Sequence, residues 1–172
     1  LFMRRLRYYS GGQTMGYAAI QKKVVLITGA STGIGLALTQ LLHQQAGYRV
    51  IATARESSMH RFEEAGVVED ANLMLYPLDV CNETQRMDLM YAIQERFDHV
   101  DILINNAGVC HRAVIEHLDS KDEAEQLSVN YQAAMCLSRL VIPDMRKQRD
   151  GLIINISSVG GMMAMPTMGA YS

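Results

Sequence analysis

Short buried-strand patterns alternate with helical patterns from residue 22 onward. Val24 to Ile27 is a β-branched apolar run, typical of a strand covered on both faces in a parallel sheet. From Leu36 the apolar residues recur at helical spacing, which predicts a helix. Further strands are predicted over 48–54, 72–78, 101–105 and 152–157, and helices over 57–66, 82–97 and 120–148. This alternation predicts an α/β fold with a right-handed, doubly wound parallel sheet.

Local patterns predict how several of these helices begin, end and pack. Gly47 is expected to end the first helix, Asn82 to cap the helix 82–97, and Ser120 with Glu123 to form a capping box. The inner faces of the two later helices are expected to carry Met87, Met90, Tyr91 and Ile93, and then Leu127, Met135, Leu140 and Val141. Asn130 falls inside the last helix, where its side chain competes for backbone hydrogen bonds and therefore needs an explanation.

A glycine-rich turn, Thr28-Gly29-Ala30-Ser31-Thr32-Gly33-Ile34-Gly35, joins the first strand to the first helix. Free backbone N–H groups and the positive end of the helix dipole favour an anion such as phosphate there. Gly29 permits a tight turn, Gly33 lets the backbone approach a phosphate, and Gly35 lets the helix pack closely on the sheet. The spacing is not the Gly-x-Gly-x-x-Gly fingerprint and lacks the end of a P-loop, so an ordinary tight turn remains an alternative.

Other polar residues fall on the same predicted edge, at the carboxyl ends of the strands, where doubly wound sheets bind ligands. Arg55 ends the second strand 20 residues after Gly35, where an acidic residue would bind the 2′-hydroxyl of NAD and a basic one the 2′-phosphate of NADP. Arginine suits a phosphate, whereas Glu56 beside it would repel one. The pattern favours NADP over NAD, and the alternative is a solvated charge at a strand end. Asp79 and Asn106 share this edge.

Length and composition limit the remaining possibilities. The 172 residues suffice for one domain, predicted over 22–172, with residues 1–21 as a flexible, basic N-terminal extension for which a transit peptide is the alternative. A net charge of −2 argues against nucleic-acid or anionic-lipid partners. Three isolated cysteines indicate a reduced compartment and no metal site. No apolar run is long enough to span a membrane, so we expect a cytoplasmic protein.

Taken in order, the motifs resemble those of the short-chain dehydrogenase/reductase family from about Lys22 to the last residue. The resemblance rests on the turn Thr28–Gly35, Asp79-Val80, Asn105-Asn106-Ala107-Gly108, Asn130, Ile156-Ser157-Ser158, and Tyr171 thirteen residues after Ser158. It implies a Rossmann-like domain that transfers a hydride between a nicotinamide cofactor and a small-molecule alcohol or carbonyl substrate.

The resemblance also implies a role for each matching residue. Tyr171 would be the general acid/base, Ser158 would hydrogen-bond the substrate oxygen, and Asn130 would hold a water in a proton relay. Asn106, Ala107 and Gly108 would line the adenosine side, with Asp79 and Val80 near the adenine. The cofactor-binding set is then Gly29, Ser31, Thr32, Gly33, Ile34, Gly35, Arg55, Asp79, Val80, Asn106, Ala107 and Gly108.

One family feature has no counterpart in this sequence. A phenol needs a nearby cation to exchange protons near neutral pH, and the family places a lysine four positions after the tyrosine, here position 175, beyond Ser172. The last two strands would also lie beyond that point. We therefore expect a domain incomplete at its C-terminal end, with little turnover as it stands, and a full-length form that assembles as a homo-oligomer. The alternatives are a nucleotide-sensing protein without turnover and an inactive enzyme fragment.

Two further features stay open at this stage. His111 follows the Asn-Ala-Gly turn and is either an ordinary loop histidine or a residue that faces substrate. Four methionines near the C-terminus either line an apolar substrate pocket or fill the core, namely Met162, Met163, Met165 and Met168.

Overall fold

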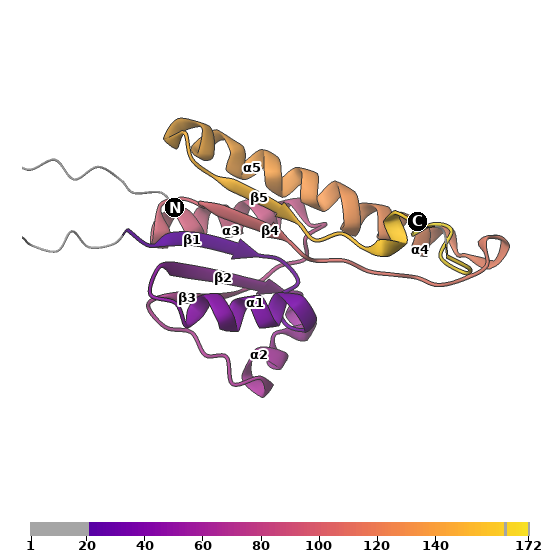
Figure 1. The fold of residues 1–172 in the computed structure, drawn as a ribbon, viewed down its shortest axis with the longest axis horizontal. Coiled ribbons are helices and arrows are strands. Elements are labelled where there is room, and N and C mark those ends of the chain that lie inside the picture. The colour runs from indigo at the N-terminus through magenta and orange to yellow at the C-terminus, as the bar shows by residue number, and fades with distance from the viewer. Residues whose placement is uncertain (1–20, 164, 172) are drawn as a thin grey trace, which may run out of the picture.

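The computed structural model describes residues 21–163 and 165–171 and contains one parallel, five-stranded sheet (Figure 1). Its strands are β1 (Lys23–Ile27), β2 (Tyr48–Ala54), β3 (Leu73–Pro77), β4 (Ile102–Asn105) and β5 (Leu152–Asn155). Their order is β3-β2-β1-β4-β5, and every neighbouring pair is parallel. The order changes direction between β1 and β4, so the carboxyl ends of these two strands mark the point where a doubly wound sheet opens a crevice.

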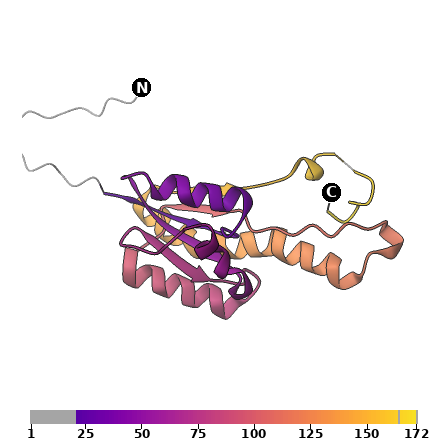
Figure 2. The same ribbon diagram turned by 90° about the horizontal axis from the view of Figure 1, so that it is seen from below.

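Helices cover both faces of the sheet, and the predicted α/β fold is confirmed. The helices are α1 (Gly33–His43), α2 (His60–Glu64), α3 (Glu83–Phe97), α4 (Ser120–Leu127) and α5 (Ala133–Gln148). Helices α3 and α5 bury side chains in one core layer, and α1 and α2 contribute to the layer on the opposite face. Figure 2 shows α1 and α3 on opposite sides of the sheet.

The expected inner face of α3 is partly wrong. Met87 and Tyr91 are 53% and 67% exposed. The buried stripe is instead Arg86, Leu89, Ile93 and Phe97, which also follows helical spacing. Several apolar residues on this helix fit two overlapping stripes, and contact with the sheet selects the one that includes Phe97. The predicted cap is right, because the Asn82 side chain accepts a hydrogen bond from the Gln85 N–H at 3.1 Å.

The long helix predicted over 120–148 is two α-helices joined by the π-helical turn η3 (Ser128–Gln132). A π turn inserts an extra residue and rotates everything that follows. After the turn, Leu137 and Val141 are therefore buried while Met135 is exposed. Leu127, which precedes the turn, is exposed as well, so the expectation that it faces the core is also wrong.

Two predicted helix ends are also wrong. Asp119, not Ser120, caps α4, and its carboxylate accepts from the Lys121 N–H at 2.8 Å. Helix α1 ends with Gln44 as its cap, three residues before Gly47, and this cap keeps a right-handed helical conformation. The left-handed glycine that sequence patterns suggest is therefore not used here.

The buried carboxylate of Asp101 joins the amino ends of β1 and β4. It accepts from the Val24 N–H at 2.8 Å and from Lys23 Nζ at 2.7 Å, and the same ammonium bonds Asp150 at 3.0 Å. These bonds raise the pKa of Lys23, chiefly through Asp101 and then Asp150, and lower the pKa of Asp150 through Lys23. Because the pKa of Lys23 is raised and that of Asp150 is lowered, the cluster stabilises the fold at pH values between the ordinary pKa values of an aspartate and a lysine. Its contribution is lost as Asp150 protonates in acid or Lys23 deprotonates in alkali.

We expect Asp101→Ala to lower the free energy of unfolding by about 2 kcal/mol, because a buried N–H and an ammonium lose their shared acceptor. Urea unfolding followed by circular dichroism measures this change. Asp98→Asn is the matched control, since Asp98 is exposed and, within the described part of the chain, its carboxylate pairs with His99 alone; such pairs contribute about 0–1 kcal/mol. Equal destabilisation by the two substitutions would contradict the role given to Asp101.

Candidate functional site

A cavity of about 820 Å³ lies at the carboxyl edge of the sheet. Of the residues predicted from the sequence as site residues, those that line it are Gly29, Ser31, Thr32, Ile34, Arg55, Asp79, Val80, Asn106, Ala107, Gly108, Asn130, Ser158 and Tyr171. Gly33 and Gly35 do not line the cavity. They lie at the start of α1, where they shape the turn that does. The structure thus brings together segments spread from residue 29 to residue 171.

The glycine-rich turn lies in close contact with the segment that follows β4. A Cβ at Gly29 would lie 2.8 Å from Ala107 Cα, and one at Gly35 would lie 2.5 Å from Asn106 Nδ2. Gly29 also has φ of +62°, in the left-handed region that favours glycine. A side chain at either position would push the two segments apart. The close packing expected of Gly35 is therefore with Asn106 and with the turn's own backbone.

Thr28 and Asn106 hold the two segments together through four hydrogen bonds. Thr28 Oγ1 accepts from the N–H groups of Asn106 and Ala107, both at 3.0 Å. In return, Asn106 Nδ2 donates to the carbonyl oxygens of Thr28 at 2.9 Å and Gly29 at 3.0 Å. The side chain of Asn106 therefore fixes the shape of the turn, in addition to bordering the cavity. Sequence reasoning did not assign this contact to Thr28, because it joins residues 78 positions apart.

The N-terminus of α1 is free to bind an anion. Within the described part of the chain, the N-cap Thr32 makes no side-chain hydrogen bond to the helix, and the first turn has no acidic residue. Ordinarily such groups satisfy the first N–H groups and offset the helix dipole. The neighbouring residues Thr32 and Ile34 border the cavity. This donor set, with the space left by the glycines, fits the phosphates of a dinucleotide.

The carboxylate of Asp79 is engaged with its own turn. Its Oδ1 accepts from the Cys81 N–H at 2.9 Å, and the Asp79 N–H donates to the side chain of Gln85 at 2.6 Å. Burial, and then the charge of Asp79, raise the pKa of the Cys81 thiol. Cys81 is thus kept in the thiol form, although it too borders the cavity.

Asn130 lies in the π turn η3, and its amide pairs with one residue of the segment after β4. Its Oδ1 accepts from the Val109 N–H, and its Nδ2 donates to the Val109 carbonyl, both at 2.9 Å. The amide thereby supplies both backbone partners that an extended neighbouring strand would supply. This pairing explains why an asparagine lies in the middle of a long helical segment, at the turn where the helix widens.

Ser158 and Tyr171 are both held by the 3₁₀ turn η4 (Val159–Gly161). Ser158 Oγ accepts from the Gly160 N–H at 3.1 Å. A Cβ at the buried Gly160 would lie 2.9 Å from Tyr171 Cε1, so the phenol ring packs where a side chain would otherwise be. The Tyr171 N–H donates to the Met168 carbonyl at 2.9 Å. One short turn therefore positions both hydroxyl-bearing side chains at the cavity.

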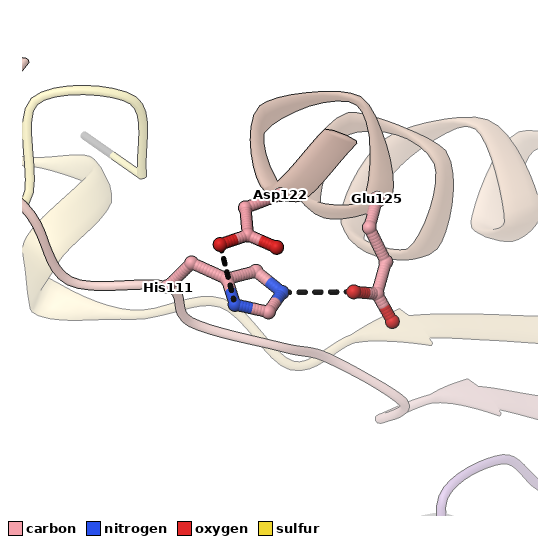
Figure 3. A group of neighbouring side chains, drawn as sticks. All are labelled: His111, Asp122 and Glu125. Carbon is pink, nitrogen blue, oxygen red and sulfur yellow. Dashed lines mark hydrogen bonds and ion pairs between the residues drawn. The ribbon is translucent and has the colours of Figure 1, made fainter. Parts of the chain in front are cut away.

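His111 lies between two carboxylates of α4 and ties the loop after β4 to this helix (Figure 3). Its Nε2 is 2.9 Å from Glu125 and its Nδ1 is 3.8 Å from Asp122, while its backbone N–H donates to Gln126 Oε1 at 2.9 Å. Each ring nitrogen faces a different carboxylate, at 2.9 Å from Glu125 and 3.8 Å from Asp122. His111 is therefore a positioning residue rather than an unconstrained loop histidine.

The four C-terminal methionines do not line the cavity. Met162 and Met163 are 88% and 62% exposed, and only Met168 is buried. Of the two uses expected for these residues, core filling thus applies to Met168 alone.

We expect Asn130→Ala to speed hydrogen exchange at the Val109 amide by about tenfold, because this N–H loses its acceptor. Asn130→Asp keeps an acceptor and loses the donor, so its effect should be smaller. Asn82→Ala removes a cap on α3 and serves as the control that leaves the Val109 amide unchanged. Exchange at Val109 that is equal in all three variants would contradict the pairing.

Comparison with known families agrees with this geometry. A family profile described as short chain dehydrogenase matches residues 23–172. A 3-ketodihydrosphingosine reductase from Bacteroides thetaiotaomicron is 35% identical over 153 residues, which cover 89% of this chain and 53% of the relative. A 3-oxoacyl-[acyl-carrier-protein] reductase FabG from Thermotoga maritima is 33% identical over 159 residues, covering 89% of this chain and 62% of the relative. The chain thus spans little more than half the length of these curated relatives.

Solved structures lead to the same group of proteins. A short-chain dehydrogenase from Streptomyces avermitilis aligns with a TM-score of 0.79 at 29% identity, covering 87% of this chain and 55% of that one. The closed form of a serine dehydrogenase complexed with NADP+ aligns with a TM-score of 0.77 at 29% identity, covering 86% and 59%. None of the helices within residues 21–163 and 165–171 combines the length and apolar character needed to cross a membrane.

Proposed function

The chain belongs to the short-chain dehydrogenase/reductase family, and on that premise we propose that it is the nucleotide-binding part of an NADP-preferring oxidoreductase that interconverts an alcohol and a ketone or aldehyde. One observation carries the proposal. A single cavity connects the glycine-rich turn at the N-terminus of α1 with Ser158 and Tyr171. The two hydroxyl groups at this cavity favour an enzyme over a protein that only senses a nucleotide, because nucleotide binding alone does not require a proton donor beside the substrate position.

The residues at the carboxyl edge of the sheet would hold the cofactor. The turn from Gly29 to Gly35 would take the pyrophosphate, Asp79 and Val80 the adenine, and the segment 106–108 the adenosine side. This assignment is supported by the N-terminus of α1, where Thr32 makes no capping hydrogen bond among the described residues, and by the close approach that Gly29 and Gly35 permit. When bound, a nicotinamide dinucleotide supplies or accepts the hydride.

The chain's own side chains would move the proton and orient the substrate. Tyr171 would give a proton to the substrate oxygen during reduction and remove it during oxidation. The Ser158 oxygen already accepts from Gly160, so its O–H remains free to donate to the same substrate oxygen. Asn130 keeps a second N–H and a second lone pair beyond its bonds to Val109, which suffices to hold a water.

Two further proposals concern the substrate and the assembly of the whole protein. The names of the two relatives describe reduction of 3-keto groups, which supports a ketone as the oxidised substrate.

We propose a homo-oligomer because Leu127, Tyr131 and Met135 are 56%, 60% and 40% exposed at spacings of four residues along α4, η3 and α5.

We expect Tyr171→Phe to reduce turnover by a factor of about 10² to 10⁴, because the ring remains while the transferable proton is lost. Stopped-flow or steady-state oxidation of NADPH with a panel of ketones measures turnover, using the product of the whole reading frame. NADPH fluorescence measures binding in the same samples, which we expect to be unchanged. Tyr91→Phe is the control, since Tyr91 is exposed on α3 and does not border the cavity. Full turnover by Tyr171→Phe would exclude the proposed acid/base.

A second prediction concerns the residue encoded four positions after Tyr171. We propose that a lysine stands four positions after Tyr171, where a cation would favour the deprotonated phenol. Sequencing through and past the codon for Ser172 tests this directly. A different residue at that position would remove the catalytic proposal and favour a nucleotide-sensing role.

A further inference from the structure

We propose that Arg61 is a second determinant of cofactor choice, which binds the 2′-phosphate of NADP together with Arg55. The inference rests on the proposed function and adds a residue that the sequence pattern did not assign. Arg61 lies in α2, six positions after Arg55, and both residues border the main cavity.

The local fold brings both arginines to the lining of the same cavity. Arg55 leaves β2 in an extended conformation, and the Ser58 N–H then donates to the Arg55 carbonyl at 2.7 Å, which turns the chain back in η1 (Glu56–Ser58). Helix α2 is anchored by Phe62, which is 1% exposed. With Phe62 fixed in the core, the preceding residue Arg61 lies at the surface, one helical turn after Ser58, which borders the same cavity.

Both guanidinium groups are free of partners among the described residues. Neither side chain makes a hydrogen bond or an ion pair there, whereas Arg86 and Arg96 donate to backbone carbonyl oxygens. Two positive charges that border one cavity repel each other. A phosphate dianion between them would relieve that repulsion and accept several charge-assisted hydrogen bonds.

The nearby acidic groups gather on the side of Arg55 that faces a second cavity. This adjoining cavity, of about 440 Å³, is bordered by Glu56 and Asp88, and also by Arg55 and Asp79, which border the main cavity as well. Asp79 directs Oδ1 to the Cys81 N–H. Glu56 does not border the main cavity, whereas Arg61 borders the main cavity and not the adjoining one. Arg61 therefore adds positive charge where Glu56 takes no part, and guanidinium groups suit a phosphate better than a free ribose hydroxyl.

The test compares two ligands that differ only in the 2′-phosphate. Isothermal titration of the protein gives the dissociation constants of 2′,5′-ADP and 5′-ADP. We expect 2′,5′-ADP to bind more tightly, and Arg61→Ala to reduce that preference by about tenfold while leaving 5′-ADP unaffected. Arg61→Lys should keep part of the preference, because it retains the charge without the planar fork. Arg139→Ala is the control, since Arg139 is exposed on α5 and does not border the cavity.

The possible results separate the role of Arg61 from the proposed function. A preference in Arg61→Ala that equals the preference in Arg139→Ala overturns the role of Arg61 and leaves the proposed function intact. Failure of the unsubstituted protein to bind either ligand overturns the proposed function and this inference together. A preference that weakens less steeply with added salt in Arg61→Ala than in the unsubstituted protein supports the charge-based contact, because Arg55 alone then remains.

Discussion

The close contact between the glycine-rich turn and the segment after β4 is the constraint on which the site depends. Neighbouring strands β1 and β4 meet at the point where the strand order changes direction. Thr28 and Asn106 bond across this point in both directions, and the missing side chains of Gly29 and Gly35 leave room for the contact. Without it, the first turn of α1 and the start of the next loop would not border one cavity.

The part of the cavity bordered by Asn130, Ser158 and Tyr171 depends on contacts between segments that are far apart in the sequence. Asn130 pairs with the backbone of Val109, and His111 ties the same loop to α4. Gly160 lets the ring of Tyr171 pack on the turn that also holds Ser158. These contacts fix the groups proposed for proton transfer on loops, while the sheet supplies the rigid frame.

The sequence predicted the sheet well because each strand is a short apolar run, β-branched in every case except β3, which is Leu-Met-Leu-Tyr-Pro. The predicted range of β2, Tyr48–Ala54, is the observed one. It predicted the edge at which site residues gather, since parallel strands point their carboxyl ends the same way. For α3 it predicted Ile93 correctly but placed Met87 and Tyr91 on the buried face as well, because they follow an equally periodic stripe. The π turn could not be read from periodicity, since the pairing of Asn130 with Val109 that accompanies it joins residues 21 positions apart. The contacts of Thr28 and the place of Arg61 likewise depend on tertiary packing.

The central claim is that one dinucleotide extends from the turn at α1 to the turn that holds Ser158 and Tyr171. The most direct measurement is amide chemical-shift mapping of the ¹⁵N-labelled protein during titration with NADP+. We expect the largest amide chemical-shift changes at residues 29–35 and 106–109, together with changes at residues 158–161. Shifts confined to the exposed side of α4 and α5, with both turns unaffected, would contradict it.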